Sequence, residues 1–410
     1  MSKINDNILV PKLRFPEFVN DEGWSEDGIG DKFKFKQGVQ MPVESQYLIY
    51  QAGLVRFIRI IDVTNKEEPH RYIENPGNEH LIEENDLFMI RYGTPGVVSI
   101  GYKGVIANNL FRLIWKDADL FIPGYWFYSL QKKEKTILDL SGSSSMPAIS
   151  FSTLESLKVQ FPLNPKEQKK IASCLSSLDE VITAESQKLN ILQVHKKGLL
   201  QNLLPQVGET FPKFRFKDFE YSGDWQETTL TQVANYENGK AHEQDIADDG
   251  EFIVVNSKFI SQDGEVKKFT NTAFCPAAKG DVLMVLSDIP NGKAIAKCFL
   301  VEEDNRYTVN QRICRITPRN IDSKILYYLL NRHPYFLAFD DGVKQTNLRK
   351  EDVLNCPLMI PEDPKEQEKI ADTLSSIDEL IIAQGQKLKA LQLHKKGLLQ
   401  GLFPSINNVE

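Results

Sequence analysis

The chain has 410 residues, of which 41% are hydrophobic and 26% are charged, and its formal net charge is −7. This composition excludes collagen-like and disordered proteins, and no apolar run reaches the ~18 residues of a membrane span. The N-terminus lacks the apolar core of a secretory signal, so we expect a cytoplasmic protein. Because nucleic-acid binders usually carry a basic excess, this acidic chain could bind one only through a clustered basic face. The five cysteines include no C-x-x-C pair, which predicts isolated thiols.

The first 160 residues are predicted to be mixed α/β. The motif P-K-x-R-F at residues 11–15 is followed by Trp24. β-Branched and aromatic runs predict strands at Val55–Val63, Leu87–Arg91, Val97–Ile106 and Leu110–Trp115. Glycine and proline at residues 92–96 predict a turn, and Pro123–Leu138 is predicted to be a helix.

A second region repeats this order with different residues. P-K-x-R-F recurs at residues 212–216 and is followed by Trp225. Strands are predicted at Phe252–Asn256, Val282–Ser287, Ala294–Val301 and Ile313–Thr317, a turn at 289–292 and a helix at Asp322–Leu337. The sequence therefore predicts one α/β fold, used twice with two different surfaces.

Each copy ends in a nearly identical segment. Residues 165–205 and 364–404 align without a gap, and 28 of the 41 positions are identical. Apolar residues recur at alternating spacings of four and three, which predicts two long helices with a coiled-coil seam that pair antiparallel. The seam positions are Ile171, Leu175, Leu178, Ile182, Glu185, Leu189 and Leu192 in the first helix, and Ile370, Leu374, Ile377, Ile381, Gln384, Leu388 and Leu391 in the second.

Two seam positions are polar in both copies, Glu185 with Gln384 and Lys196 with Lys395. A polar group in a seam costs stability but fixes the register. Antiparallel pairing would bring Glu185 beside Gln384. The alternative is that these residues mark a bulge in an imperfect seam, and the sequence leaves both open.

The ends of the two helices carry more leucine than one seam can use. The extra apolar face predicts partner docking by Leu199, Leu200, Leu203, Leu204, Leu398, Leu399, Leu402 and Phe403. The alternative is that these side chains pack on the α/β regions of the same chain.

No catalytic signature was found in the sequence. It contains no G-x-x-x-x-G-K-[ST], no H-E-x-x-H and no G-x-S-x-G. The Asn/Asp-Pro-Pro-aromatic tetrad of adenine methyltransferases is missing as well. We therefore expect neither a catalytic residue nor a metal site in this chain.

The opening motif, the helix start P-x-x-E-Q-x-x-I-A-x-x-L and the ending K-L-x-x-L-Q-x-H-K-K-G-L-L-Q resemble the specificity subunit of type I restriction–modification systems. The resemblance implies target recognition domains at 1–160 and 206–358, each reading one half of an interrupted double-stranded DNA target. It implies conserved helices at 161–205 and 359–410 that set the spacer and dock two methyltransferase subunits. Restriction-motor subunits would complete the complex, and S-adenosylmethionine, ATP and magnesium would bind to partner subunits, none to this chain.

Candidate DNA-contacting residues were chosen near predicted strand ends, because Arg and Lys pair with guanine and Asn and Gln with adenine. They are Arg91, Lys103, Asn109 and Arg112 in the first domain, and Lys293, Asn310, Gln311, Arg312, Lys344, Gln345, Asn347 and Arg349 in the second. For each of them a solvated loop side chain is the alternative. For the whole chain, the alternative is a cytoplasmic scaffold whose coiled coil joins two ligand-binding domains without a DNA role.

Overall fold

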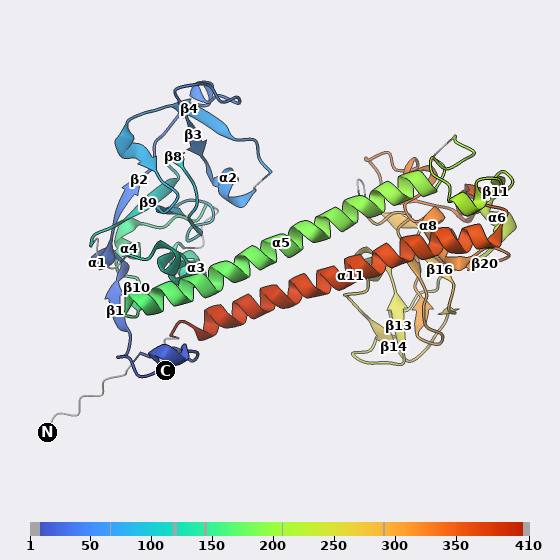
Figure 1. The fold of residues 1–410 in the computed structure, drawn as a ribbon. Helices are drawn as coiled ribbons and strands as arrows, with labels where there is room; N and C mark the ends of the chain where they lie inside the picture. The colour runs from blue at the N-terminus through green and yellow to red at the C-terminus, as the bar shows by residue number, and fades with distance from the viewer. Residues whose placement is uncertain are drawn as a thin grey trace. The chain divides into compact units, whose positions relative to one another are not determined.

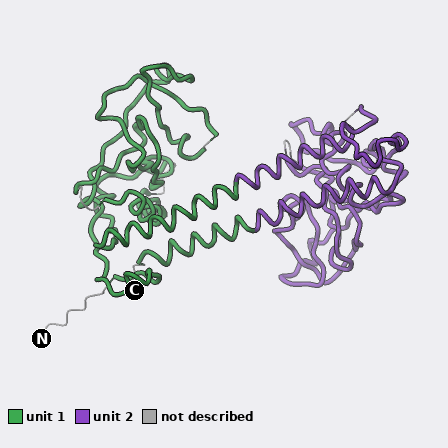
Figure 2. The backbone as a smooth tube through the Cα atoms, in the orientation of Figure 1, with its two compact units in different colours: residues 1–186, 387–410 green, residues 187–386 purple. Residues whose placement is uncertain are grey.

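The computed structural model describes residues 9–65, 67–117, 121–142, 146–206, 208–289 and 292–404 (Figure 1). The chain divides into two compact units. Unit 1 comprises residues 1–186 and 387–410, and unit 2 comprises residues 187–386 (Figure 2). The division falls inside both long helices, α5 (Pro165–Leu203) and α11 (Pro364–Gly401). Each unit therefore holds the first half of one helix and the second half of the other.

Unit 1 contains two four-stranded sheets, in the orders β2-β9-β6-β7 and β4-β3-β8-β5, and the pair β1-β10. Its strands are β1 (Ser25–Gly28), β2 (Phe33–Gln37), β3 (Leu54–Ile58), β4 (Arg71–Glu74), β5 (Leu81–Ile82), β6 (Leu87–Ile90), β7 (Val98–Ser99), β8 (Gly104–Ile106), β9 (Leu110–Trp115) and β10 (Lys158–Phe161). Its shorter helices are α1 (Ile29–Lys32), α2 (Ile60–Thr64), α3 (Pro123–Leu140) and α4 (Phe151–Glu155).

Unit 2 repeats this topology, with sheets β12-β20-β16-β18 and β14-β13-β19-β15 and the pairs β11-β22 and β17-β21. Its strands are β11 (Gln226–Thr229), β12 (Ala234–Asn238), β13 (Phe252–Val255), β14 (Phe269–Thr270), β15 (Pro276–Ala277), β16 (Val282–Val285), β17 (Ser287–Asp288), β18 (Cys298–Leu300), β19 (Tyr307–Val309), β20 (Ile313–Pro318), β21 (Thr346–Asn347) and β22 (Pro357–Ile360). Its shorter helices are α6 (Leu230–Val233), α7 (Ser257–Ser261), α8 (Ser323–Leu330), α9 (Pro334–Leu337) and α10 (Lys350–Leu354).

The two long helices begin in the same way. The side chain of Asn164 accepts a hydrogen bond from the amide of Lys166 at 3.0 Å, and Asp363 does the same for Lys365 at 2.9 Å. A capping side chain followed by proline at the first helical position is a strong helix start, because the missing proline N–H would have no partner there. The predicted starts at Pro165 and Pro364 agree with the structure.

Several predicted elements are shorter in the structure. The strand from Val55 ends at Ile58, because Asp62 accepts the amide of Arg59 at 2.8 Å and starts helix α2. The predicted Val97–Ile106 strand is broken between β7 and β8, where Gly101 has a φ of 85°. Only Cys298–Leu300 of the predicted Ala294–Val301 strand is formed, and Ala296 ahead of it has a φ of 54°.

The predicted helix Asp322–Leu337 is divided into α8 and α9. Arg332 has a φ of 60°, outside the helical range. Pro334, which lacks an N–H for a continuing helix, begins α9 instead. Of the predicted turn at 289–292, residues 290 and 291 lie outside the described part of the chain.

The core of each unit is completed by the end of a long helix. In unit 1, Leu402 and Phe403 are buried in the cluster that contains Trp24 and Tyr125. In unit 2, Leu203 and Leu204 take the same place in the cluster that contains Trp225. Four cysteines, Cys275, Cys298, Cys314 and Cys356, are free and buried in unit 2, as isolated thiols, and Cys174 is half-buried.

Candidate functional site

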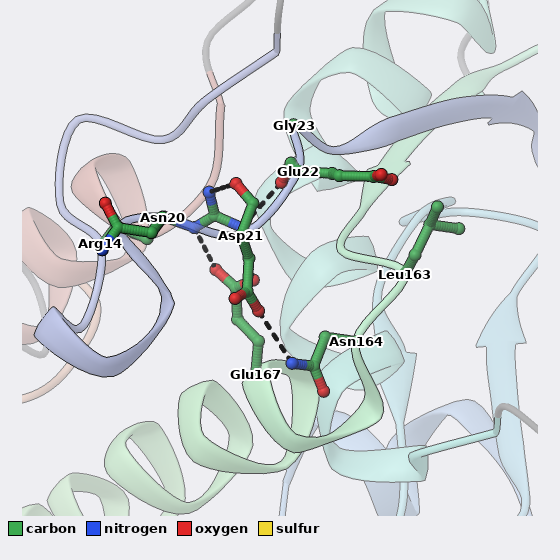
Figure 3. A pocket seen from close by; sticks show the side chains of 8 residues that line it. All are labelled: Arg14, Asn20, Asp21, Glu22, Gly23, Leu163, Asn164 and Glu167. Atoms are coloured by element: carbon green, nitrogen blue, oxygen red, sulfur yellow. Dashed lines mark hydrogen bonds and ion pairs between the residues drawn. The ribbon is translucent and has the colours of Figure 1, made fainter.

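A buried ion pair joins the opening motif of each copy to its long helix, and Figure 3 shows the pair of the first copy. Arg14 donates two hydrogen bonds of 2.9 Å to the carboxylate of Glu167, whose side chain is 1% exposed. Arg14 also donates to the carbonyls of Asp21 and Glu22, and the Trp24 indole donates to Glu167. Its bonds to Glu167 raise the pKa of Arg14 above its ordinary value.

The same arrangement occurs in unit 2. Arg215 donates two bonds of 2.7 Å to Glu366, and the Trp225 indole donates to the same carboxylate. In unit 1 a hollow of about 340 Å³ lies beside the pair. Because the guanidinium and the carboxylate neutralise each other there, we interpret this hollow as a structural junction and not as a ligand site.

The two long helices are antiparallel within unit 1. Lys395 forms an ion pair with Asp179 at 2.6 Å, and Lys387 pairs with Glu185, so residue numbers rise along one helix as they fall along the other. The Tyr128 hydroxyl on α3 donates to Asp179 at 2.7 Å. Burial and this hydrogen bond raise the pKa of Tyr128.

Unit 2 repeats these contacts with Lys196, Asp378 and Tyr328, whose hydroxyl donates to Asp378 at 2.8 Å. The two polar seam lysines are thus bound to aspartates of the facing helix, which favours the register interpretation over the bulge. The expected Glu185–Gln384 contact would join residues of different units and stays a prediction; within unit 2, Gln384 is buried.

The apolar seam positions lie where the heptad predicts. Each of them is buried or half-buried, while most of the helix residues between them are exposed. Ile171 and Leu175 in unit 1, and Ile370 and Leu374 in unit 2, also belong to the cores of the recognition regions.

The structure corrects the predicted docking role of the helix ends. Leu203, Leu204, Leu402 and Phe403 are between 2% and 8% exposed. Leu199, Leu200, Leu398 and Leu399 are partly buried against the same cores. These side chains pack on the chain's own recognition regions, which is the alternative interpretation, because those cores would otherwise be open at this point.

The helices expose other apolar side chains instead. In unit 1 one set is Val181 at 44% and Leu393 at 69%, and in unit 2 another is Leu380 at 55% and Val194 at 62%. Unit 2 also exposes Ile191 at 66% and Ile382 at 60%. The Asp179–Lys395 and Asp378–Lys196 pairs place the members of each set at the same level of the helix pair. Each unit therefore presents one such aliphatic pair to solvent, and unit 2 adds two exposed isoleucines.

The candidate cations of unit 1 are largely held inside the domain. The Arg91 guanidinium donates to the carbonyl of Ile149 and to Gln37, and lies 4.5 Å from the centre of the Phe151 ring. Arg112 forms an ion pair with Asp86 at 2.7 Å. Internal partners therefore hold both Arg91 and Arg112, and their contact with DNA stays a prediction.

The two remaining candidates of unit 1 differ from each other. Lys103 is exposed and pairs with Glu83 at 2.8 Å. Asn109 is half-buried, and its side-chain oxygen has no hydrogen-bond partner. These two candidates are therefore an uncharged amide and a lysine whose charge is paired with a carboxylate.

Unit 2 brings most of its candidates to one edge. The β17–β21 pairing sets Ser287 opposite Asn347 and Asp288 opposite Thr346, which joins the turn before Lys293 to the loop 344–349. The exposed candidates on this edge are Lys293, Arg312, Lys344, Gln345, Asn347 and Arg349. Gln311 is instead bound to Glu243 at 2.6 Å, and Asn310 is half-buried.

The same backbone edge exists in both units. In unit 2 the amide of Leu286 donates to Arg312, and the amide of Leu348 donates to Leu286, both at 2.8 Å. In unit 1 the amide of Arg91 donates to Asn109 at 3.0 Å, and the amide of Ile149 donates to Arg91 at 3.1 Å. Asn109 and Arg312 are therefore equivalent positions with different side chains.

Sequence reasoning missed that these loops pair with each other, and it missed the internal partners of Arg91 and Arg112. The partners lie 26 to 58 residues away, and no local pattern points to them. The Arg14–Glu167 pair carried a signal, since both motifs recur in both copies with opposite charges.

No group of three or more His, Cys, Asp or Glu side chains in the described ranges could hold a metal ion. None of the helices in that same part of the chain is both long and apolar enough to cross a membrane.

Comparison with known proteins gives consistent matches. The family described as Type I restriction modification DNA specificity domain matches residues 21–194 and 222–393. The type I restriction enzyme MjaVIII specificity subunit of Methanocaldococcus jannaschii is 25% identical over 422 residues, covering 95% of this chain and 93% of the relative. The MjaIX specificity subunit of the same organism is 27% identical over 210 residues, covering 46% of this chain and 47% of the relative.

Solved structures show the same fold. The S subunit of a type I restriction–modification system from M. genitalium has a TM-score of 0.66 at 18% identity, covering 97% of this chain and all (100%) of that one. A chain from a structure on complex assembly and conformational transition of the type I R-M system has a TM-score of 0.53 at 14% identity, covering 93% and 98%.

Proposed function

The chain belongs to the family of type I restriction modification DNA specificity domains, and we propose that it gives a type I restriction–modification complex its DNA sequence specificity. The observation that carries this proposal is the equivalent edge in the two units. The same backbone hydrogen bonds hold Asn109 in one unit and Arg312 in the other. One fold that presents two different sets of side chains fits a target made of two unlike half-sites.

Each unit would read one half-site. Base edges are read by side chains in the grooves, and phosphate contacts fix the position of the protein on the duplex. The exposed cations on the edge of unit 2 suit both tasks. In unit 1, where Arg112 and Lys103 are paired with carboxylates, the partner subunits would supply more of the phosphate attraction.

The exposed aliphatic pairs on the helices would dock two methyltransferase subunits, one pair for each subunit. Val181 with Leu393, and Val194 with Leu380, are large apolar side chains between 44% and 69% exposed. Exposed apolar patches on soluble proteins often mark protein–protein contacts. The repeated geometry supports a symmetric arrangement of the two partners on the two units.

Catalysis would reside in these partners. The methyltransferase subunits would bind S-adenosylmethionine, and the restriction-motor subunits would bind ATP and magnesium. Neither the sequence motifs nor the His, Cys, Asp and Glu clusters among the described residues supply a catalytic or metal site.

Genome-wide methylation mapping, in cells with and without this chain, tests the proposal. We expect one interrupted motif to lose its methylation when the chain is removed. Methylation that is unchanged in its absence would contradict the DNA role and favour the scaffold alternative.

Exchange of the recognition region refines the test. Replacing residues 25–150 with the same region of another specificity subunit should change one half of the motif and leave the other half intact. If both halves changed together, the two units would not be independent readers.

A further inference from the structure

We propose that Arg312 is the residue of unit 2 that reads a base, a guanine, and that the neighbouring Lys293, Lys344 and Arg349 contact phosphates. This inference rests on the proposed function and assigns separate roles within one surface. Base contacts specify the sequence, whereas phosphate contacts position the protein without reading it. The guanidinium of arginine can donate two parallel hydrogen bonds to guanine O6 and N7.

The position of Arg312 is fixed by the backbone around it. Its carbonyl accepts the amide of Leu286 at 2.8 Å, at the point where β16 continues into β17. Arg312 lies within the turn that the amide of Ile313 closes by donating to the carbonyl of Asn310 at 3.2 Å. The amide of Gln311 donates to the carbonyl of Lys240 at 3.1 Å. A side chain that reads a base needs a rigid backbone at its Cα, because a bidentate contact tolerates little displacement of the side chain.

The backbone of Arg312 is also strained. Its φ is 68°, in the left-handed region, where its side chain is exposed. For a residue with a Cβ this conformation is less favourable than the right-handed one, because Cβ comes too close to the following carbonyl oxygen. Strained residues of this kind cluster at binding sites, where the surrounding structure holds them in place. A glycine would adopt this backbone conformation more easily, so the presence of arginine indicates that its side chain has a role at this position.

The carboxylates of the two loops that the β17–β21 pairing joins are already used to shape those loops. Asp288 accepts the amides of Ile289, Ala294 and Ile295. Asp341 accepts the amides of Val343 and Lys344, and these bonds lower its pKa.

Asp340 accepts the amide of Gly342 and the Thr346 hydroxyl. In the described part of the chain, no carboxylate forms an ion pair with Lys293, Arg312, Lys344 or Arg349. These four charges are therefore free to meet an anionic partner, although the whole chain is acidic.

The flanking cations are exposed like Arg312 but differ from it in their backbone, because Arg312 is the one of these four residues with a left-handed φ. Lys293 follows the turn after β17, and Lys344 lies in the loop between Gly342 and β21. Arg349 lies just before helix α10, and its amide is bound to Asp352. Their side chains are exposed and start from loops, which suits contacts with phosphates along the backbone.

The test uses the complete chain assembled with its methyltransferase partners and a DNA library in which the second half-site is randomised. Arg312→Gly keeps the left-handed backbone, so thermal unfolding should be unchanged or slightly improved. One guanine position should lose its preference by roughly 5- to 150-fold, the range of a bidentate contact. Arg312→Lys keeps the positive charge but lacks the planar guanidinium with its two parallel donors. The affinity for DNA should therefore be closer to that of the wild type, while the preference for guanine falls.

Lys344→Ala serves as the contrasting variant. It should weaken binding equally for all sequences and lower the slope of log K against log salt by about 0.9. Lys258→Ala, which removes one exposed charge on α7, is the matched control and should leave the base preference unchanged.

Three results are separable. If the wild-type complex methylates no motif that depends on this chain, the proposed function fails. If the wild type does so but Arg312→Gly keeps every base preference, the proposed role of Arg312 is wrong. A loss of preference in the other half-site, or a base-specific effect of Lys344→Ala, would also overturn the assignment.

Discussion

The buried ion pair at the start of α5 allows a quantitative prediction for Glu167→Gln. The variant keeps the shape of the side chain and an acceptor for the Trp24 indole, but it leaves Arg14, 6% exposed, without a counter-charge. Breaking a buried pair by neutralising one partner costs about 3–5 kcal/mol. We expect the lower end, about 3 kcal/mol, because Arg14 keeps its bonds to two backbone carbonyls and lies beside an open hollow.

Such a loss should lower the melting temperature of unit 1 by roughly 6–12 °C, at 2–4 °C per kcal/mol for a domain of this size. Calorimetry gives the size of the effect, and hydrogen exchange locates it. The protection of backbone amides from hydrogen exchange should fall in the strands of unit 1 and be unchanged in those of unit 2. Glu366→Gln provides the matched control, because Arg215 holds Glu366 in the same geometry. The control should lower the melting temperature of unit 2 by a similar amount and leave that of unit 1 unchanged.

The double variant Arg14→Met with Glu167→Gln should recover part of the stability, since no unpaired charge is then buried. If Glu167→Gln lowered the free energy of unfolding by less than about 1 kcal/mol, the reasoning would be refuted, because that is the contribution of a solvent-exposed ion pair. Equal loss of protection in both units would refute it as well.

Three further predictions concern the helices. Leu393→Glu and Leu380→Glu should each prevent the binding of one methyltransferase subunit, as measured by analytical ultracentrifugation with purified partners. The control Gln392→Glu, which changes another exposed residue of α11, should leave both subunits bound. A fragment of residues 1–205 should dimerise, because Leu203 and Leu204 of the second copy can replace Leu402 and Phe403 in the core. Lys188 of the second copy would then replace Lys387 beside Glu185, and a strictly monomeric fragment in sedimentation would contradict this. Inserting seven residues after Leu189 and after Leu388 should lengthen each helix by roughly 10 Å and widen the spacer by about three base pairs, whereas an unaltered spacer in an active complex would show that the helices do not set it.

The repeat made the architecture predictable from the sequence. Two nearly identical segments identified α5 and α11, and the heptad placed Ile171, Leu175, Ile370 and Leu374 on their inner faces. The strand Leu110–Trp115 was also predicted with its observed bounds. These features depend on local periodicity, which a sequence displays directly.

The site was much less predictable. Whether a basic side chain is free depends on carboxylates that are distant in sequence, such as Asp86 for Arg112. Whether a leucine at a helix end is exposed depends on the domain packed against it, as with Leu203 and Leu204. Periodicity identifies an apolar face but does not identify what covers it.

Unit 1 is built from both ends of the chain, so it cannot be completed until translation of the chain is nearly finished. Its core needs Leu402 and Phe403, and its opening segment is bound to the last turn of α11 through the amide of Leu13 and the carbonyl of Gly401. Residues 187–386 of unit 2, by contrast, are continuous in the chain. At ribosomal rates of about 5–20 residues per second, unit 1 waits roughly 10–40 s for its last residues. On the ribosome, the N-terminal unit is therefore the last to be completed, and a nonsense mutation within the final turn of α11 would damage the first-made half of the protein.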